Sequence, residues 1–101
     1  MGKTAMISQP MRGKTEEEIL AVRDKAKQEL EGMGYDVLYT YYKFELPWHI
    51  KNESLYCLGE SLIDMAYCDA VYFCHGWADT RGCLIEHKVA EVYGIERIYE
   101  E

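Results

Sequence analysis

The sequence predicts one α/β domain over residues 1–101, built from a parallel sheet with helices on both faces. Short apolar runs of strand length alternate with longer stretches in which apolar residues recur every three or four positions. The resulting order is strand, helix, strand, long loop, helix, strand, helix and strand, which is typical of right-handed βαβ crossovers. Of the 101 residues 49% are apolar, so the chain carries enough hydrophobic material for a core.

The first half of the chain predicts two strands around one helix. Lys3 to Ser8 is a β-prone run that ends at Gln9-Pro10. Thr15 to Glu18 is a capping box, in which a Thr N-cap is followed three residues later by Glu. The helix that begins there ends at Gly32 and Gly34, and Asp36 to Tyr39 is the second strand. The residues expected to face the core from this helix are Ile19, Val22, Ala26, Leu30 and Met33.

The second half predicts two helices and two strands after a long aromatic loop, residues 40–52. Ser54 is expected to cap the first helix, which turns Leu55, Leu58, Leu62 and Met65 inward. The remaining elements are a strand over Asp69 to Cys74, a helix over Thr80 to Tyr93 that ends at Gly94, and a strand over Ile95 to Tyr99. The carboxyl ends of the first and third strands should converge, which brings residues 8–14 beside residues 75–82.

Composition argues against several kinds of partner. The net charge is −7 and no block of Lys or Arg stands out, so we expect no binding to nucleic acid polymers or to anionic membranes. No stretch resembles a signal peptide or a membrane span, because the longest apolar run, Ala70 to Cys74, is too short. The four cysteines show no C-x-x-C spacing, and buried thiols of a cytoplasmic protein are the expected interpretation.

The loop from Ser8 to Thr15 ends in Gly-Lys-Thr, like a nucleotide-binding P-loop. That motif requires Gly at the position of Ser8, and no apolar strand ends in a Mg²⁺-binding Asp, so we reject an NTPase. What remains is a strand-to-helix loop whose Arg12, Gly13, Lys14 and helix N-terminus suit a phosphate. A solvent-exposed capped turn explains the same residues equally well.

Glu86 lies on a largely apolar stripe of the last helix, with Cys83, Ala90 and Tyr93 at helical spacing. Charged residues are rarely buried unless they are paired or functional. A carboxylate held at the mouth of the sheet could act as a nucleophile or a base. The alternative is a boundary Glu that pairs with Arg81 or Lys88, and periodicity does not decide between the two.

Weaker signals point to other chemistry. Cys83 and His87, with Cys74 and His75 upstream, allow a metal site or a Cys-His nucleophilic pair to be drawn. No His-x-x-x-His or C-x-x-C supports a metal, and we expect neither a metal nor another cofactor. His49 is expected to be a lid or packing residue. The aromatic residues from Tyr39 to Trp48, which include Tyr41, Tyr42 and Phe44, suit stacking on a nucleobase or an apolar cluster beneath the loop.

Three segments carry a family resemblance: Ser8-Gln-Pro-Met-Arg-Gly13, Cys68-Asp69-Ala-Val71, and Gly76-Trp77 followed by Arg81-Gly82-Cys-x-x-Glu86. Together they resemble the nucleoside 2-deoxyribosyltransferase-like superfamily, and more narrowly its small phage- and Firmicute-associated branch. The resemblance spans nearly the whole chain, and the last segment is its most specific part. It implies a three-layer flavodoxin-like, Rossmann-like fold with four or five parallel strands, and assembly into homodimers or larger homo-oligomers.

The resemblance also implies a pocket for a nucleoside or nucleotide. In catalytic members a Glu at the place of Glu86 attacks the anomeric carbon of deoxyribose, and the glycosyl ester is released to another base or to water. The first loop resembles the phosphate-binding loop of the branch that hydrolyses deoxynucleoside 5′-monophosphates. The residues implied to bind substrate or phosphate are Ser8, Gln9, Pro10, Met11, Arg12, Gly13, His75, Gly76, Trp77, Thr80, Arg81 and Gly82.

At one position the chain departs from the family pattern. Catalytic relatives carry an Asp eight residues before the Asp of the third strand, and this chain has Ser61 there. Asp69 itself begins the strand at its far end and is expected to be structural. Two function classes therefore stay open. One is a deoxyribosyltransferase or nucleotide N-glycosidase that uses Glu86, and the other is a phage or prophage protein that binds or sequesters a nucleotide or nucleotide signal without cleaving it.

Overall fold

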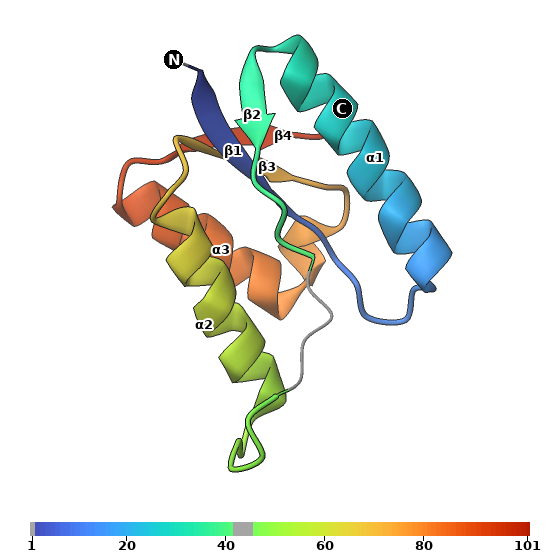
Figure 1. The fold of residues 1–101 in the computed structure, drawn as a ribbon, viewed down its shortest axis with the longest axis vertical. Helices are drawn as coiled ribbons and strands as arrows, with labels where there is room; N and C mark the ends of the chain where they lie inside the picture. The colour runs from blue at the N-terminus through green and yellow to red at the C-terminus, as the bar shows by residue number, and fades with distance from the viewer. Residues whose placement is uncertain (1, 42–45) are drawn as a thin grey trace.

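The computed structural model describes residues 2–41 and 46–101, which form a four-stranded parallel sheet between two layers of helices (Figure 1). The strands β1 (Lys3–Ser8), β2 (Tyr35–Val37), β3 (Ala70–Phe73) and β4 (Glu96–Tyr99) lie in the order β2-β1-β3-β4. The helices are α1 (Glu16–Gly32), α2 (Glu53–Met65) and α3 (Arg81–Val92), and a short 3₁₀ helix, η1 (Trp77–Asp79), precedes α3. The predicted α/β class is confirmed, and the arrangement is compatible with a three-layer flavodoxin-like fold.

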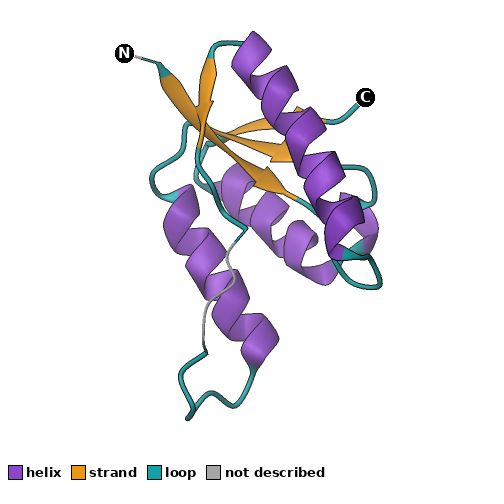
Figure 2. Cartoon of the chain, turned by 45° about the vertical axis from the view of Figure 1, so that its right-hand side comes forward, coloured by secondary structure: helices purple, strands orange, loops and turns teal. Residues whose placement is uncertain are grey.

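Helix α1 covers one face of the sheet, and α2 and α3 cover the other (Figure 2). Side chains alternate along each strand, so β1 and β3 feed two cores. All four residues of β3 are buried, as expected for a strand covered on both faces. The core under α1 contains Ala5, Ile7, Ala26, Leu30, Ala70, Tyr72 and Cys74, and the core under α2 and α3 contains Met6, Met65, Val71, Phe73 and Ala90.

The carboxyl ends of β1 and β3 form the switch point of the sheet, because the chain leaves β1 for α1 and leaves β3 for α3 on the opposite face. The backbone N–H of Cys74 donates to the carbonyl of Ser8 at 3.0 Å. Just beyond, Gly76 adopts φ 89°, and a Cβ added there would meet Pro10 at 3.4 Å. The predicted approach of residues 8–14 to residues 75–82 is therefore confirmed.

The capping box of α1 is confirmed, since Thr15 Oγ1 accepts from the backbone N–H of Glu18 at 3.1 Å and the Glu18 carboxylate accepts from the Thr15 N–H at 3.2 Å. The expected inward stripe is also confirmed, with one exception. Met33 is 56% exposed, because it is the C-cap residue, where the chain has already turned toward β2.

The cap of α2, the inward position of Leu55 and the ends of two strands differ from the predictions. Asn52, not Ser54, caps α2, and its Oδ1 accepts from the backbone N–H of Leu55 at 2.9 Å. Leu55 is 63% exposed rather than inward, because the first turn of α2 extends past the end of the sheet (Figure 1). Strands β2 and β3 are shorter than predicted, and Asp69 lies just outside β3. As expected, Asp69 has a structural contact: its Oδ2 accepts from the backbone N–H of Thr4 at 2.8 Å.

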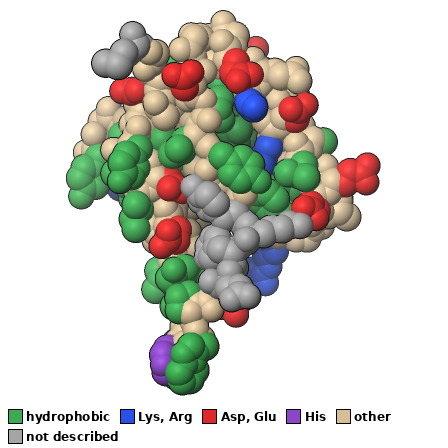
Figure 3. Space-filling model, in the orientation of Figure 1, with side chains coloured by type: hydrophobic (Ala, Val, Ile, Leu, Met, Phe, Trp, Pro, Cys, Tyr) green, Lys and Arg blue, Asp and Glu red, His purple; other side chains and the backbone are tan. Residues whose placement is uncertain are grey.

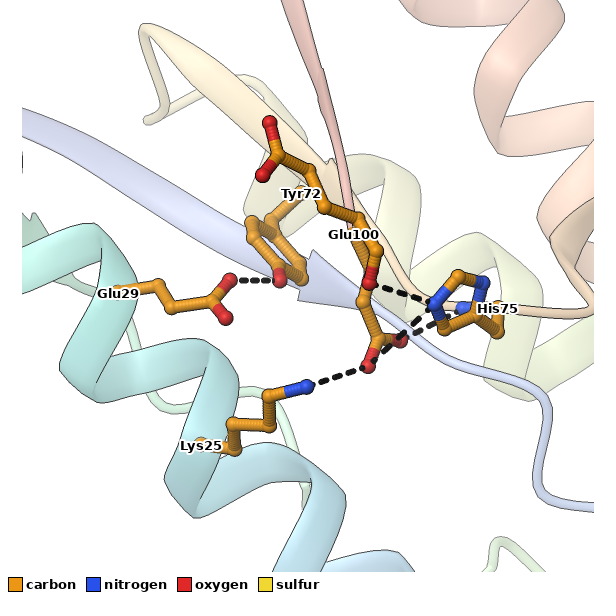
Figure 4. A network of polar contacts seen from close by, with 6 residues as sticks. Lys25, Glu29, Tyr72, His75 and Glu100 are labelled. Atoms are coloured by element: carbon orange, nitrogen blue, oxygen red, sulfur yellow. Dashed lines mark hydrogen bonds and ion pairs between the residues drawn. The ribbon is translucent and has the colours of Figure 1, made fainter.

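The end of the chain is tied to the neighbouring elements by polar contacts (Figure 4). Glu100 accepts from the backbone N–H of His75 at 2.8 Å and from Lys25 Nζ at 3.4 Å. Beside it, the Tyr72 hydroxyl donates to Glu29 of α1. These contacts join β3, α1 and the residues after β4.

Acidic side chains are spread over the face drawn in Figure 3, with hydrophobic side chains gathered between them, in keeping with the net charge of −7. Within residues 2–41 and 46–101, none of the helices has the length and apolar character that a membrane crossing requires.

Candidate functional site

Glu86 lies at the switch point with its side chain buried against β1. The residue is 7% exposed, and its Oε1 accepts a hydrogen bond from Ser8 Oγ at 2.8 Å. Ser8 is the last residue of β1 and is itself 2% exposed. Cys83, Glu86 and Ala90 form the buried stripe of α3, and Glu86 on this stripe meets the end of β1 at Ser8. The alternative that Glu86 pairs with Lys88 is wrong, because Lys88 pairs with Glu91 at 3.1 Å.

Burial raises the pKa of the Glu86 carboxyl above its ordinary value. Hydrogen bonds from Ser8 and Ser61 and the positive charge of Arg23 act in the opposite direction and stabilise the ionised form. The carboxylate is thus held in a site that disfavours its charge, with donors that partly compensate. Carboxyl groups with pKa values shifted in this way are common at functional sites.

Arg23 is a second buried charge at the site, and it belongs to none of the motifs in the sequence. It is 8% exposed, its Nη1 donates to Gln9 Oε1 at 3.3 Å, and its Nη2 donates to Thr40 Oγ1 at 2.6 Å. Burial lowers the pKa of Arg23, which nonetheless stays a cation because its usual value is far above neutrality. The helical period does indicate that Arg23 is buried, because it lies on the inward stripe of α1, four residues after Ile19 and three before Ala26.

A cavity of about 220 Å³ opens beside Glu86. Arg23 from α1 lines it on one side and Ser61, Leu58 and Cys57 from α2 line it on another. The start of α3 contributes Thr80 and Gly82, whose position presents a helix N-terminus to the cavity. Of the residues expected at the site, the structure brings these seven together here: Ser8, Gln9, Met11, Ser61, Thr80, Gly82 and Glu86.

The other expected residues lie around this cavity without lining it, as far as residues 2–41 and 46–101 show. Arg12 and Gly13 are exposed in the turn that the hydrogen bond from Lys14 N to Met11 O closes. Pro10 is buried against Gly76. Arg81 is exposed on the first turn of α3. A role of these residues in phosphate binding stays a prediction.

His75 and Trp77 face the β4 side of the sheet instead. The His75 ring Nε2 lies 2.9 Å from the backbone carbonyl of Glu101 and 3.9 Å from the Glu100 carboxylate (Figure 4). The Trp77 ring stacks on His87 with a centroid distance of 4.2 Å, and His87 Nε2 lies 2.7 Å from the Tyr99 hydroxyl. These contacts place both residues in the cluster that holds the end of the chain.

Among the described residues, the contacts of the histidine rings are with partners other than thiols. His87 contacts Trp77 and Tyr99, and burial raises the pKa of Cys83, which disfavours its thiolate. Burial likewise raises the pKa of Cys74 to about 12. Among the residues that the structure describes, no group of three His, Cys, Asp or Glu side chains is arranged to hold a metal ion.

The structure describes only some of the aromatic residues predicted to cluster in the loop, and these have different surroundings. Tyr42 and Phe44 lie outside the described residues. Trp48 is 87% exposed and its ring lies 3.5 Å from that of His49, in the loop before α2. Tyr41 is close to the site, with its ring centroid 5.6 Å from the guanidinium carbon of Arg23. Tyr41 therefore links the start of the loop to the buried charge of Arg23.

One comparison with known proteins identifies a family. The family model described as "Domain of unknown function (DUF4406)" matches residues 3–99. No match was found among curated proteins, and none among solved structures. The resemblance to nucleoside 2-deoxyribosyltransferase-like proteins thus rests on the motifs alone. Because the match extends over nearly the whole α/β domain and includes every element that builds the Glu86 cavity, the chain belongs to the DUF4406 family.

Proposed function

We propose that the protein binds a nucleoside or nucleotide in the Glu86 cavity and cleaves its N-glycosidic bond, as a deoxyribosyltransferase or a deoxynucleoside 5′-monophosphate N-glycosidase. The observation that carries this proposal is the buried Glu86 carboxylate, hydrogen-bonded to Ser8 and set in the wall of a cavity at the sheet's switch point. Ligands of open α/β sheets bind at this location. A carboxylate beside a sugar is the group that glycosidic cleavage needs.

In the proposed reaction a Glu86 oxygen attacks the anomeric carbon of the deoxyribose. The bond from that carbon to the base nitrogen breaks, and the base leaves with the electron pair and takes a proton from water. The glycosyl ester is then attacked by water or by a second base, which restores the carboxylate. The hydrogen bond from Ser8 fixes the carboxylate's orientation, and the donors around Glu86 keep enough of it ionised for attack.

The phosphate of a nucleotide would lie at the start of α3. Thr80 and Gly82 line the cavity there, and free N–H groups and the helix dipole at an N-terminus favour an anion. Arg12, Gly13 and Arg81 are exposed close to the same end of the sheet, where they could contact the phosphate of a bound nucleotide. The chemistry of these groups supports a phosphorylated ligand.

A second candidate function, binding without cleavage, is favoured by one observation. Among the described residues that line the cavity, Glu86 is the sole Asp, Glu or His, and Ser61 stands where catalytic relatives carry an Asp. Ser61 instead lines the same cavity and helps to lower the pKa of Glu86 against the effect of burial. A site with this lining could hold a nucleotide while leaving its base poorly protonated, and therefore uncleaved.

Incubation with deoxynucleosides and their 5′-monophosphates, followed by chromatography for free base, tests the proposal. Release of base that Glu86→Gln abolishes would support the enzyme. The matched control is Glu91→Gln, because Glu91 is exposed on the same helix and should be dispensable. A thermal shift with a nucleotide and no release of base would favour the binding protein, and no shift and no release would refute both.

We also propose that the chain assembles into homodimers or larger oligomers, as the resemblance implies. Large apolar side chains are exposed on the helices of one face, among them Leu55 and Ile63 of α2 and Leu84 of α3, at 63%, 56% and 45%. Light scattering after size exclusion tests this, and a monomer of 11.8 kDa at high concentration would contradict it.

A further inference from the structure

We propose that a second hollow, between α1 and the chain that follows β2, holds the nucleobase of the ligand whose sugar lies at Glu86. This inference rests on the proposed function. The hollow has a volume of about 510 Å³. The Glu86 cavity has about 220 Å³, less than the roughly 300–1,000 Å³ typical of small-molecule sites. A whole nucleoside therefore needs room beyond that cavity, and the second hollow offers it.

The two hollows share part of their lining. Ile7, Arg23 and Thr40 contribute to both. Arg23 donates to Thr40 Oγ1 at 2.6 Å, so these two side chains form a common rim. A group attached to the anomeric carbon of a sugar at Glu86 would cross this rim into the second hollow.

The walls of the second hollow suit a flat apolar group. Leu20 on α1 and Val37 and Leu38 at the end of β2 line it. Tyr39, which is 63% exposed, also lines it. Aromatic side chains stack on bases of any kind, and aliphatic walls exclude water from their faces.

The polar groups of the second hollow favour a base over a phosphate. Arg23 and Lys27 supply hydrogen-bond donors, and Asp24 supplies an acceptor. The two hydrogen bonds that Arg23 makes to Gln9 and Thr40 use two of its five N–H donors. The edges of nucleobases carry both donors and acceptors, which this set matches. A phosphate offers acceptors alone, and the Asp24 carboxylate would repel it.

Filling the second hollow tests the proposal. Ala21 lines this hollow but not the Glu86 cavity and is exposed on α1, so Ala21→Phe should fold normally while occupying the space. We expect this variant to bind deoxyadenosine and thymidine at least about tenfold more weakly by calorimetry, a loss of about 1.4 kcal/mol. Binding of 2-deoxyribose 5-phosphate, which has no base, should stay within about twofold because its site is untouched. The matched control is Glu31→Phe, at an exposed position near the other end of α1, which should change neither affinity.

Failure of this inference can be told apart from failure of the proposed function. If Ala21→Phe binds deoxynucleosides as tightly as the wild type, or loses both ligands equally, the base does not occupy the hollow, whatever the wild type cleaves. If the wild type releases no base but Ala21→Phe selectively loses deoxynucleosides, the hollow holds the base and the cleavage proposal fails. Saturation-transfer NMR with free adenine gives an independent readout. Adenine should bind to the wild type and to Glu86→Gln but not to Ala21→Phe, and equal binding to all three would overturn the assignment.

Discussion

Replacing Glu86 with glutamine should make the folded protein more stable at neutral pH. The carboxylate is 7% exposed, and burial raises its pKa above the ordinary value of 4.5 even though Ser8, Ser61 and Arg23 oppose the rise. The folded protein therefore binds this proton more tightly than the unfolded chain does. The stability that this difference provides is fully present below about pH 4.5 and is lost as the pH rises through the folded pKa. A glutamine side chain does not ionise in this range and keeps nearly the same volume.

The size of the effect follows from the pKa itself. Each unit by which the folded pKa exceeds the unfolded one corresponds to about 1.4 kcal/mol. In a domain of about 100 residues, 1 kcal/mol moves Tm by roughly 4–8 °C. A ¹³C NMR titration of the Glu86 carboxyl therefore predicts the gain in Tm without an adjustable parameter.

The assay is thermal unfolding of wild type and Glu86→Gln, followed by circular dichroism between pH 4 and pH 8. The difference in Tm should open as the pH rises and close as it approaches about pH 4.5, where both side chains are neutral. The control Glu91→Gln should give no gain, because Glu91 is exposed and Lys88 holds its pKa below the ordinary value. A glutamine variant that is less stable than the wild type, by the same amount at every pH, would refute the reasoning. A gain would mean that the chain keeps a carboxylate at a cost in stability, as functional sites do.

Three further predictions concern the surroundings of the site. Arg23→Met removes the guanidinium that donates to Gln9 and Thr40, and it should lower the free energy of unfolding by about 2–4 kcal/mol in urea titrations. An unchanged urea midpoint would show that these two hydrogen bonds do not stabilise the fold. Gly76→Ala places a Cβ on a residue with φ 89° and should lower the free energy of unfolding by about 1–2 kcal/mol. The control is Gly59→Ala, which lies in α2 with open space around it and should stabilise the helix. In Glu100, burial is outweighed by the His75 N–H and Lys25, which hold the pKa of this carboxyl below its ordinary value. The stability that the Glu100 carboxylate provides is present above about pH 4.5 and lost at lower pH. Glu100→Gln should therefore lower Tm at pH 7 but not at pH 3. A loss of the same size at both pH values would contradict this electrostatic explanation.

Features that depend on neighbours along the chain could be predicted from the sequence. The capping box of Thr15 and Glu18 is confirmed because an N-cap and its partner are three residues apart in any helix. Gly94 ends α3 with φ 71°, and the N–H of Ile95 donates to the carbonyl of Ala90 at 2.8 Å, which again involves one turn of chain. The period of its helix placed Glu86 on a largely apolar stripe, but it left open whether this carboxylate is functional or pairs with a nearby cation.

Predictions failed where a residue's place depended on how far the sheet extends. Leu55 has the spacing of a core residue, yet it is exposed because the first turn of α2 extends past the four described strands. His75 and Trp77 carry the family resemblance, yet neither lines the Glu86 cavity. The His75 ring contacts Glu100 and Glu101 after β4, and the Trp77 ring contacts His87 of α3 and Tyr99 of β4. Motif spacing gives the order of residues but not the direction of each side chain.

The sequence by itself determined the parallel α/β class, most of the helix ends and the choice of Glu86, because these follow from periodicity and from contacts within one turn. Only the tertiary structure decided what surrounds that carboxylate. Ser8 is 78 residues away from Glu86, and Arg23 and Ser61 come from helices on opposite faces of the sheet. They meet because the strand order β2-β1-β3-β4 places the ends of β1 and β3 side by side, and no local pattern encodes which distant side chains will share that point.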